Sequence, residues 1–183
     1  MELKEQLIDS KPVYAGKIFK VRQDRVRLPN GKEATRDVVE HPGAVAVVPV
    51  MPDGQIVLVR QYRHPVGQIM LEIPAGKLDP GEAPDVCARR ELEEETGFQA
   101  GKLTKLTAFY SGPGFTDEIL YLYLAEELTA ADQKLDNDEF INVEYFSRND
   151  LKEVIRKQEI IDAKTLIGLL MVGCFNEDRK SVV

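Results

Sequence analysis

Short runs of apolar and β-branched residues, separated by turn residues, recur along most of this 183-residue chain. The segment from residue 12 to about 40 is divided by Leu28-Pro29-Asn30-Gly31-Lys32, where Asn-Gly predicts a hairpin turn. Met51-Pro52-Asp53-Gly54 separates the runs 45–50 and 56–59 and predicts a second hairpin. Further strands are expected at 69–73, 103–110, 119–124 and 143–146.

Three other segments have the character of helices. Pro84 suits a first helical position, Asp85 suits the positive first turn, and Gly97 suits the left-handed cap after the last turn, so about three helical turns are expected between them. Residues 149–157 and 162–175 also have helical spacing. Strands and helices mixed with hairpins predict an α+β fold or a mixed-sheet sandwich, and not a doubly wound parallel sheet.

The helix that ends at Gly97 is strongly acidic. Two of its carboxylates, Glu91 and Glu95, are four residues apart, which places like charges on one face. The other spacings predict two supporting ion pairs, Arg89 with Glu93 and Arg90 with Glu94. Clustered carboxylate oxygens of this kind bind Mg²⁺ or Mn²⁺, with Glu94 at the edge of the same face. A solvated glutamate-rich face is the alternative interpretation.

The residues around this helix complete a longer pattern. They follow G-x5-E-x7-R-E-U-x-E-E-x-G-U, with U a bulky apolar residue, through Gly76, Glu82, Arg90, Glu91, Leu92, Glu94, Glu95, Gly97 and Phe98. This is the Nudix box, and the chain here resembles the Nudix hydrolases. The resemblance implies a mixed β-sheet between helices and divalent-metal hydrolysis of a nucleoside diphosphate linked to another moiety. It favours the metal-binding interpretation of Glu91, Glu94 and Glu95 and implies a second-shell or additional-metal role for Glu82.

Composition sets the limits of these interpretations. The chain is 43% hydrophobic and 30% charged, and it has no apolar run of roughly 18 residues, so a membrane span is not expected. The N-terminus lacks a signal-peptide pattern, so the cytoplasm is the expected location. A net charge of −7 argues against sequence-independent nucleic-acid binding. Two cysteines and two histidines form neither a disulfide framework nor a zinc site, so any metal must have oxygen ligands.

Two segments before the helix are similar to those of ADP-ribose pyrophosphatases. They are Arg60-Gln61-Tyr62-Arg63 and Leu71-Glu72-Ile73-Pro74-Ala75-Gly76. The resemblance implies that Arg63 and Glu72 face the substrate, that the Ala75 carbonyl joins the metal ligands, and that Leu78 also contacts the substrate. Arginine suits a pyrophosphate because its planar donors bind pairs of oxygens, although a surface ion pair is the alternative for Arg63.

A glycine-rich loop follows the expected strand 103–110. Pro113 lies sixteen residues after Gly97, where ADP-ribose pyrophosphatases carry a proline. A Gly-Pro-Gly loop exposes backbone N–H groups and admits a ligand, and a plain structural turn has the same composition. The resemblance implies that Gly114 and Phe115 lie near the terminal ribose.

The acidic segment before the expected strand 143–146 is a loop candidate. Loops on a rigid scaffold often carry catalytic groups. By resemblance, Glu139 is the candidate base for the attacking water, with Asp138 and Asp136 as substitutes, and Glu94 and Glu82 assist catalysis. An exposed acidic turn is the alternative.

The predicted activity is Mg²⁺-dependent hydrolysis of ADP-ribose to AMP and ribose 5-phosphate. Residues 1–41 are expected to form an N-terminal β-hairpin region for dimerisation and substrate binding, and residues 42–183 the hydrolase domain. Phe19 and Arg36 are the candidates for stacking on adenine, or else hairpin packing residues. A homodimer is expected. The alternatives are a related enzyme for another nucleoside diphosphate sugar or dinucleotide, and a non-enzymatic ligand-sensing module.

Overall fold

The computed structural model describes residues 2–174, and these residues form two compact units. The smaller unit contains the chain up to Gly43 together with residues 109–120. The larger unit contains residues 44–108 and the chain from Tyr121 onward. The smaller unit is therefore built from two separate stretches of sequence.

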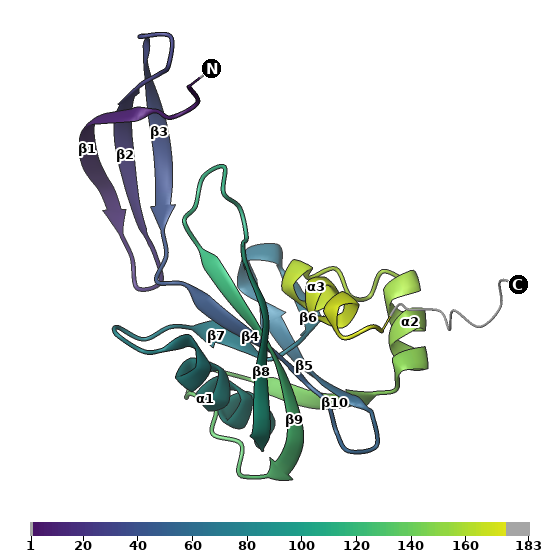
Figure 1. Ribbon diagram of the computed structural model, residues 1–183. Helices are drawn as coiled ribbons and strands as arrows, with labels where there is room; N and C mark the ends of the chain where they lie inside the picture. Colours follow the sequence, from purple (N-terminus) through teal and green to yellow (C-terminus); the bar gives the residue numbers. More distant parts are fainter. Residues whose placement is uncertain (1, 175–183) are drawn as a thin grey trace, which may run out of the picture. The chain divides into compact units, whose positions relative to one another are not determined.

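The smaller unit is a three-stranded antiparallel sheet. Its strands are β1 (Gln6–Ala15), β2 (Lys20–Arg27) and β3 (Glu33–Glu40), in the order β1-β2-β3 (Figure 1). The predicted hairpin turn joins β2 to β3, and Gly31 there has a φ of +82°. Strand β1 was not predicted before residue 12, because nearly all of its residues are exposed and no apolar alternation marks it.

The larger unit contains two sheets. One has the order β10-β5-β6 and the other β7-β4-β9-β8. The strands are β4 (Ala44–Pro49), β5 (Ile56–Arg63), β6 (Gln68–Glu72), β7 (Ala75–Lys77), β8 (Phe98–Tyr110), β9 (Ile119–Ala130) and β10 (Ile141–Phe146), with a short 3-10 helix at His64–Val66. The helices are α1 (Pro84–Thr96), α2 (Arg148–Arg156) and α3 (Ala163–Met171). The predicted α+β fold, with sheets between helices, is confirmed (Figure 1).

The turn at residues 51–54 is present, with Gly54 at a φ of +87°. The hairpin predicted there is wrong, because β4 and β5 belong to different sheets and share only the Val50 to Ile56 bridge. Strand β4 is buried along its whole length and packs between layers. Strand β4 pairs with β7 and β9 instead, and β5 pairs with β10 and β6.

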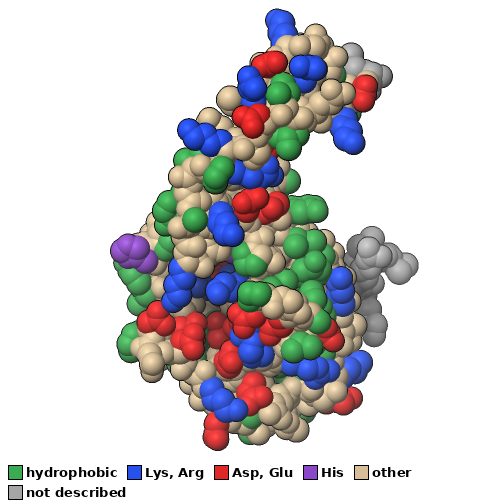
Figure 2. Space-filling view, turned by 90° about the vertical axis from the view of Figure 1, so that its left-hand side faces the viewer, with side chains coloured by type: hydrophobic (Ala, Val, Ile, Leu, Met, Phe, Trp, Pro, Cys, Tyr) green, Lys and Arg blue, Asp and Glu red, His purple; other side chains and the backbone are tan. Residues whose placement is uncertain are grey.

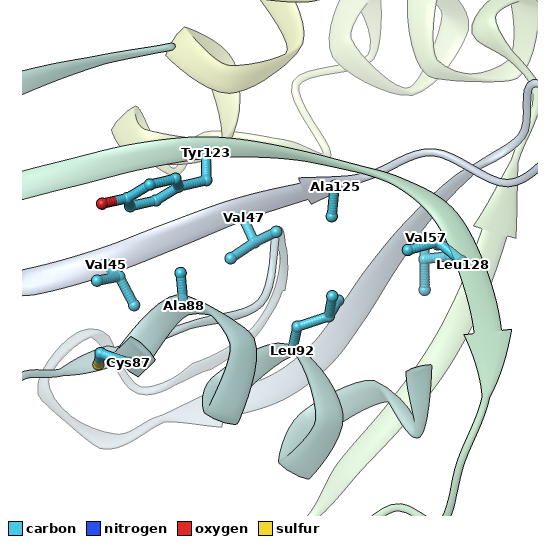
Figure 3. Close-up of a cluster of buried hydrophobic side chains, with 9 residues drawn as sticks. All are labelled: Val45, Val47, Val57, Cys87, Ala88, Leu92, Tyr123, Ala125 and Leu128. Atoms are coloured by element: carbon cyan, nitrogen blue, oxygen red, sulfur yellow. The ribbon is translucent and has the colours of Figure 1, made fainter. Parts of the chain in front are cut away.

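Helix α1 covers one face of β4. Its apolar side chains Cys87, Ala88 and Leu92 meet Val45 and Val47 of β4 in the core, and Figure 3 shows Ala88 and Leu92 pointing toward this strand. The full cluster also contains Val57, Tyr123, Ala125 and Leu128. Burying a Val or Leu side chain contributes roughly 1.5–3 kcal/mol, so this cluster fixes α1 firmly on the sheet.

Both ends of α1 follow the predicted signals. Pro84 stands in the first turn, and Gly97 takes the left-handed conformation with φ of +70° and donates its N–H to Glu93 O at 2.9 Å. The segment after β9 caps the helix end, because the N–H groups of Ala131 and Lys134 donate to the carbonyls of Gly97 and Glu94. The acidic helix is thus held at a fixed length and angle.

Helix α3 packs on the other side of β4. A Cβ atom at Gly168 would lie 2.8 Å from Val48 and 3.0 Å from Ile73, so the helix approaches the sheet closely only because this residue is glycine. Asp162 caps the helix by accepting the Thr165 N–H at 2.9 Å. The predicted helices 149–157 and 162–175 correspond to α2 and α3, and residue 175 lies outside the described residues.

Candidate active site

The carboxylates of the acidic helix are organised by one arginine. Arg90 binds Glu82 through two hydrogen bonds of 2.9 Å, from Nε and Nη2, and its Nη1 donates to Glu91 at 2.7 Å and to Glu94 at 2.9 Å. The pairing of Arg90 with Glu94 is confirmed. These bonds lower the pKa of Glu82 to about 2. Glu82 therefore fixes the guanidinium of Arg90, and Arg90 in turn positions the carboxylates of Glu91 and Glu94.

The expected pair of Arg89 with Glu93 is wrong. Arg89 instead donates to the carbonyl of Ala100 at 2.6 Å, and Glu93 accepts from Lys134 at 2.7 Å. The i,i+4 spacing allows this ion pair, but each side chain instead binds a partner outside the helix: Ala100 in β8 for Arg89, and Lys134 in the loop after β9 for Glu93. Glu91 has no cation at i,i+4 spacing, but it pairs with the adjacent Arg90.

Glu91 lies against the backbone of Gly76. A Cβ atom at this position would be 2.0 Å from the Glu91 carboxyl carbon, so only glycine leaves room for the carboxylate. Burial raises the pKa of Glu91, against the lowering effect of Arg90, and Glu94 and Glu139 raise it further. Glu94 on the same helix and Glu139 from a distant segment therefore both oppose ionisation of Glu91.

Glu95 is the most buried carboxylate of the helix, at 3% exposure. It accepts the Ala75 N–H at 3.1 Å, which places Ala75 directly beside it. Burial raises its pKa to about 8, and the charges of Glu91 and Glu139 add to this effect. A buried carboxylate with like-charged neighbours is costly unless a cation joins it.

This donor set fits a hard divalent cation. Glu91 and Glu95 project from one face of α1 as oxygen donors, and the Ala75 backbone lies beside Glu95. Across residues 2–174, no three acidic, histidine or cysteine side chains are already arranged as a complete ligand set. Figure 2 shows Asp and Glu side chains gathered on one face of the larger unit, with Lys and Arg among them.

Arg63 and Glu72 form a second part of the same region. Arg63 donates from Nε and Nη2 to the two oxygens of Glu72, both at 2.9 Å. Glu72 is only 1% exposed, so it meets Arg63 inside the protein, whereas 36% of the Arg63 side chain is exposed. The hydrogen bonds to Glu72 raise the pKa of Arg63 against the lowering effect of burial, and the charge of Glu95 adds to this.

Glu139 lies in the turn before β10. Its N–H donates to Asp136 O at 3.0 Å, and its carboxylate accepts the Asp136 N–H at 3.2 Å. Its charge reaches both Glu91 and Glu95. The charge of the predicted base thus contributes to the raised pKa of two of the predicted metal ligands. Leu78, by contrast, packs against the core cluster behind α1.

The remaining predicted substrate residues belong to the smaller unit. Arg36, Gly114 and Phe115 line one pocket of about 380 Å³, and the N–H of Val39 in β3 fastens its loop by donating to Phe115 O at 2.8 Å. Arg36 also forms an ion pair with Glu5. Phe19 lines a different pocket of about 290 Å³ and packs against Tyr14, with ring centroids 5.8 Å apart.

Comparison with known proteins identifies the family of the chain. The sequence profile of the NUDIX domain matches residues 40–166. The chain belongs to the Nudix hydrolase family. Residues 5–39 match the profile of the nucleoside diphosphate sugar hydrolase N-terminal domain. Nudix pyrophosphatases generally need a divalent metal ion, as the donor set on α1 suggests.

Two similar proteins cover most of the chain. An ADP-ribose pyrophosphatase from Bacillus subtilis (strain 168) is 48% identical over 91% of each chain. A methanol dehydrogenase activator from Bacillus methanolicus is 41% identical over 90% of each chain. Among solved structures, an ADP compounds hydrolase has the same fold, with a TM-score of 0.83 and 23% identity over 94% of each chain.

One residue in contact with Glu72 was missed in the sequence. Lys164 contacts the Glu72 carboxylate and binds Asp162 at 3.1 Å, yet it is 92 residues from Glu72 along the chain. The signal that could have revealed it is a lysine in the positively charged first turn of a helix, where a cation is unfavourable.

No helix among residues 2–174 is long and apolar enough to cross a membrane.

Proposed function

We propose that the chain hydrolyses the pyrophosphate bond of ADP-ribose to AMP and ribose 5-phosphate, with Mg²⁺ as the metal. The observation that carries the proposal is the carboxylate pair Glu91 and Glu95, of which Glu95 is buried, near the partly exposed guanidinium of Arg63. An acidic pair calls for a hard cation, and an arginine calls for an oxyanion. A diphosphate that binds together with Mg²⁺ would satisfy both.

Glu91, Glu94, Glu95 and the Ala75 carbonyl would hold the metal. Once bound, Mg²⁺ neutralises diphosphate oxygens and lowers the pKa of a coordinated water. Because burial raises the pKa of Glu95 to about 8, this group has the most to gain from a cation. Arg90 keeps Glu91 and Glu94 turned toward the shared face.

The remaining chemistry requires a base and a cationic clamp. Glu139 would accept a proton from the attacking water. The water oxygen would form a bond to one phosphorus as the bridging P–O bond breaks. The electron pair of that bond leaves with the other phosphate. Arg63 would bind the diphosphate oxygens and stabilise their charge. Its bonds to Glu72 use Nε and Nη2, so Nη1 is on the opposite side of the guanidinium.

The nucleoside and ribose ends require recognition by other groups. The pocket lined by Arg36, Gly114 and Phe115 supplies a guanidinium, an exposed aromatic ring and an accessible backbone in one unit. Phe19, 40% exposed, offers a second flat face. We assign these residues to recognition of the substrate outside the diphosphate.

We propose a cytoplasmic homodimer. The smaller unit exposes several large apolar side chains, a composition typical of an interface: Leu7, Val13, Tyr14, Ile18 and Phe19. Cys87 and Cys174 are free and buried, which suits a reducing compartment. Light scattering of Leu7→Lys and Val13→Lys variants tests this interface. If the interface holds the dimer together, each variant should have half the mass of the wild-type protein. An unchanged mass in both variants contradicts an interface at this surface.

The activity is tested with a panel of nucleoside diphosphate derivatives at equal concentration and saturating Mg²⁺. The proposal predicts that ADP-ribose has the highest kcat/KM and yields AMP and ribose 5-phosphate in equal amounts. A flavin dinucleotide and several nucleoside diphosphate sugars serve as competitors. If ADP-ribose is among the poorest substrates, the proposal for the substrate is wrong.

A second candidate is hydrolysis of another nucleoside diphosphate sugar. The match of residues 5–39 to a nucleoside diphosphate sugar hydrolase N-terminal domain favours this class. The metal site, Arg63 and Glu139 would serve it in the same way, because each of them acts on the diphosphate. The substrate panel separates the two candidates by the sugar and base preferred.

A further inference from the structure

A buried ionic network connects β6 to the start of α3. Arg63 binds both oxygens of the Glu72 carboxylate, and Lys164 contacts one of them, Oε2. The Nζ of Lys164 also lies 3.1 Å from Asp162. The exposed side-chain fractions are 2% for Glu72 and 13% for Lys164. Two cations and two anions therefore balance each other around a Glu72 carboxylate that is shielded from water.

Lys164 stands at the second position of α3, where the helix end is positively charged. A lysine there is opposed by the helix dipole. The fold nevertheless fixes it in place, because the Thr165 hydroxyl accepts the Ile73 N–H at 3.0 Å and donates to Asp162 at 2.6 Å. Helix α3 is thus tied to the residue directly after Glu72.

We propose that Lys164 is a positioning residue that acts on the substrate diphosphate through Glu72 and Arg63. The inference rests on the proposed function, since it requires that Arg63 binds a diphosphate. Lys164 keeps the Glu72 carboxylate turned toward Arg63. That carboxylate then orients the guanidinium through its two parallel hydrogen bonds.

The charge balance gives Lys164 a second effect on the same step. When Arg63 binds an anionic ligand, its positive charge is shared between the ligand and Glu72. Lys164 then continues to compensate the buried Glu72 carboxylate. Without Lys164, the network of Arg63, Glu72 and Asp162 carries one net negative charge, which repels a diphosphate and leaves a buried anion poorly paired.

A double-mutant cycle on kcat/KM tests the proposal. Lys164→Met in the wild-type background is expected to lower kcat/KM for ADP-ribose by about 10-fold or more, a size typical of coupled contacting residues. In an Arg63→Gln background, the same change is expected to alter kcat/KM by less than about threefold, because the route through Arg63 is already lost. Lys164→Arg, which keeps the charge, is expected to recover most of the activity.

Lys102→Met is the matched control, because Lys102 also pairs with a glutamate, Glu126 at 2.7 Å, but on the exposed surface. It should leave kcat/KM unchanged. Should Lys164→Met fold poorly by circular dichroism, Lys164→Gln takes its place in the cycle. The proposal is overturned if the effects of the Lys164 and Arg63 substitutions multiply, or if neither Lys164 variant lowers kcat/KM.

The proposed substrate is judged separately from Lys164. If the wild-type protein prefers another nucleoside diphosphate sugar, the proposed substrate is wrong, and the cycle is measured with that preferred substrate. The inference about Lys164 then stands or falls on coupling to Arg63 alone.

Discussion

The carboxylate of Glu91 occupies the space in which a side chain at Gly76 would lie, since a Cβ atom there would be 2.0 Å from the carboxyl carbon. Gly76→Ala is therefore expected to displace Glu91. The cost in folding free energy should be about 1–3 kcal/mol, as for other overpacked sites, with a marked loss of hydrolysis. Denaturant unfolding and the rate of AMP release measure the two effects.

Glu91→Ala provides the control for this clash. In that background, Gly76→Ala should cost much less unfolding free energy, because the group that it displaces is gone. Equal costs in both backgrounds would show that the glycine serves the backbone and not the carboxylate.

Arg90 and Arg89 are adjacent on α1 but differ in what they hold. Arg90 binds three carboxylates, whereas Arg89 donates to one carbonyl, that of Ala100. Arg90→Lys loses the bidentate geometry at Glu82 and should lower kcat/KM by about 10-fold or more, since the conservative charge does not replace the fork. Arg89→Lys should change it by less than twofold. Similar losses for both variants would contradict the organising role of Arg90.

The raised pKa of Glu95 predicts a pH-dependent stability in metal-free protein. Between the unfolded value near 4.5 and the folded value of about 8, the folded state keeps a proton that the unfolded state has lost. The unfolding free energy therefore falls as pH rises through this window, by at most about 1.4 kcal/mol per pH unit from this group.

Chemical unfolding in EDTA at pH 5 to 8 tests this expectation against Glu95→Gln, which cannot ionise. The wild-type protein should lose stability relative to the variant as pH increases, and Mg²⁺ should restore more stability at pH 8 than at pH 5.5. Parallel pH profiles for the two proteins would contradict the burial of an ionisable Glu95.

Glu139 is expected to act on the proton of the attacking water. Glu139→Gln should lower kcat by about 10²-fold or more, because general base catalysis typically contributes this much, while KM changes little. Asp138→Asn, in the same loop, is the control. If Asp138→Asn or Asp136→Asn causes the larger loss, the base is that neighbour and not Glu139.

Turn and capping residues in the sequence predicted the helix ends and the β2–β3 turn of this fold. Pro84 and Gly97 mark the two ends of α1 as observed, and Asn30-Gly31 marks the turn between β2 and β3. The divergence of β4 and β5 into different sheets was not predictable from the turn between them. It depends on pairing with strands that follow much later in the sequence.

The candidate site shows the same division. The spacing of Arg90 and Glu94 predicted their ion pair, because both lie on one helix. The equal spacing of Arg89 and Glu93 failed, since Lys134 and the Ala100 carbonyl are nearby only after folding. Lys164 illustrates the limit, because its contact with Glu72 joins two elements far apart in the chain.

The most direct test of the central claim is the rate of AMP formation from ADP-ribose across a range of Mg²⁺ concentrations. The wild-type protein and Glu93→Gln, whose carboxylate binds Lys134 on the outer surface, should saturate at similar Mg²⁺ concentrations and reach similar rates. Glu95→Gln should be slower by about 10²-fold or more at every concentration, since it removes a buried metal ligand. Wild-type turnover by Glu95→Gln, or undiminished wild-type turnover in EDTA, would contradict the assignment of Glu91 and Glu95 as the metal site.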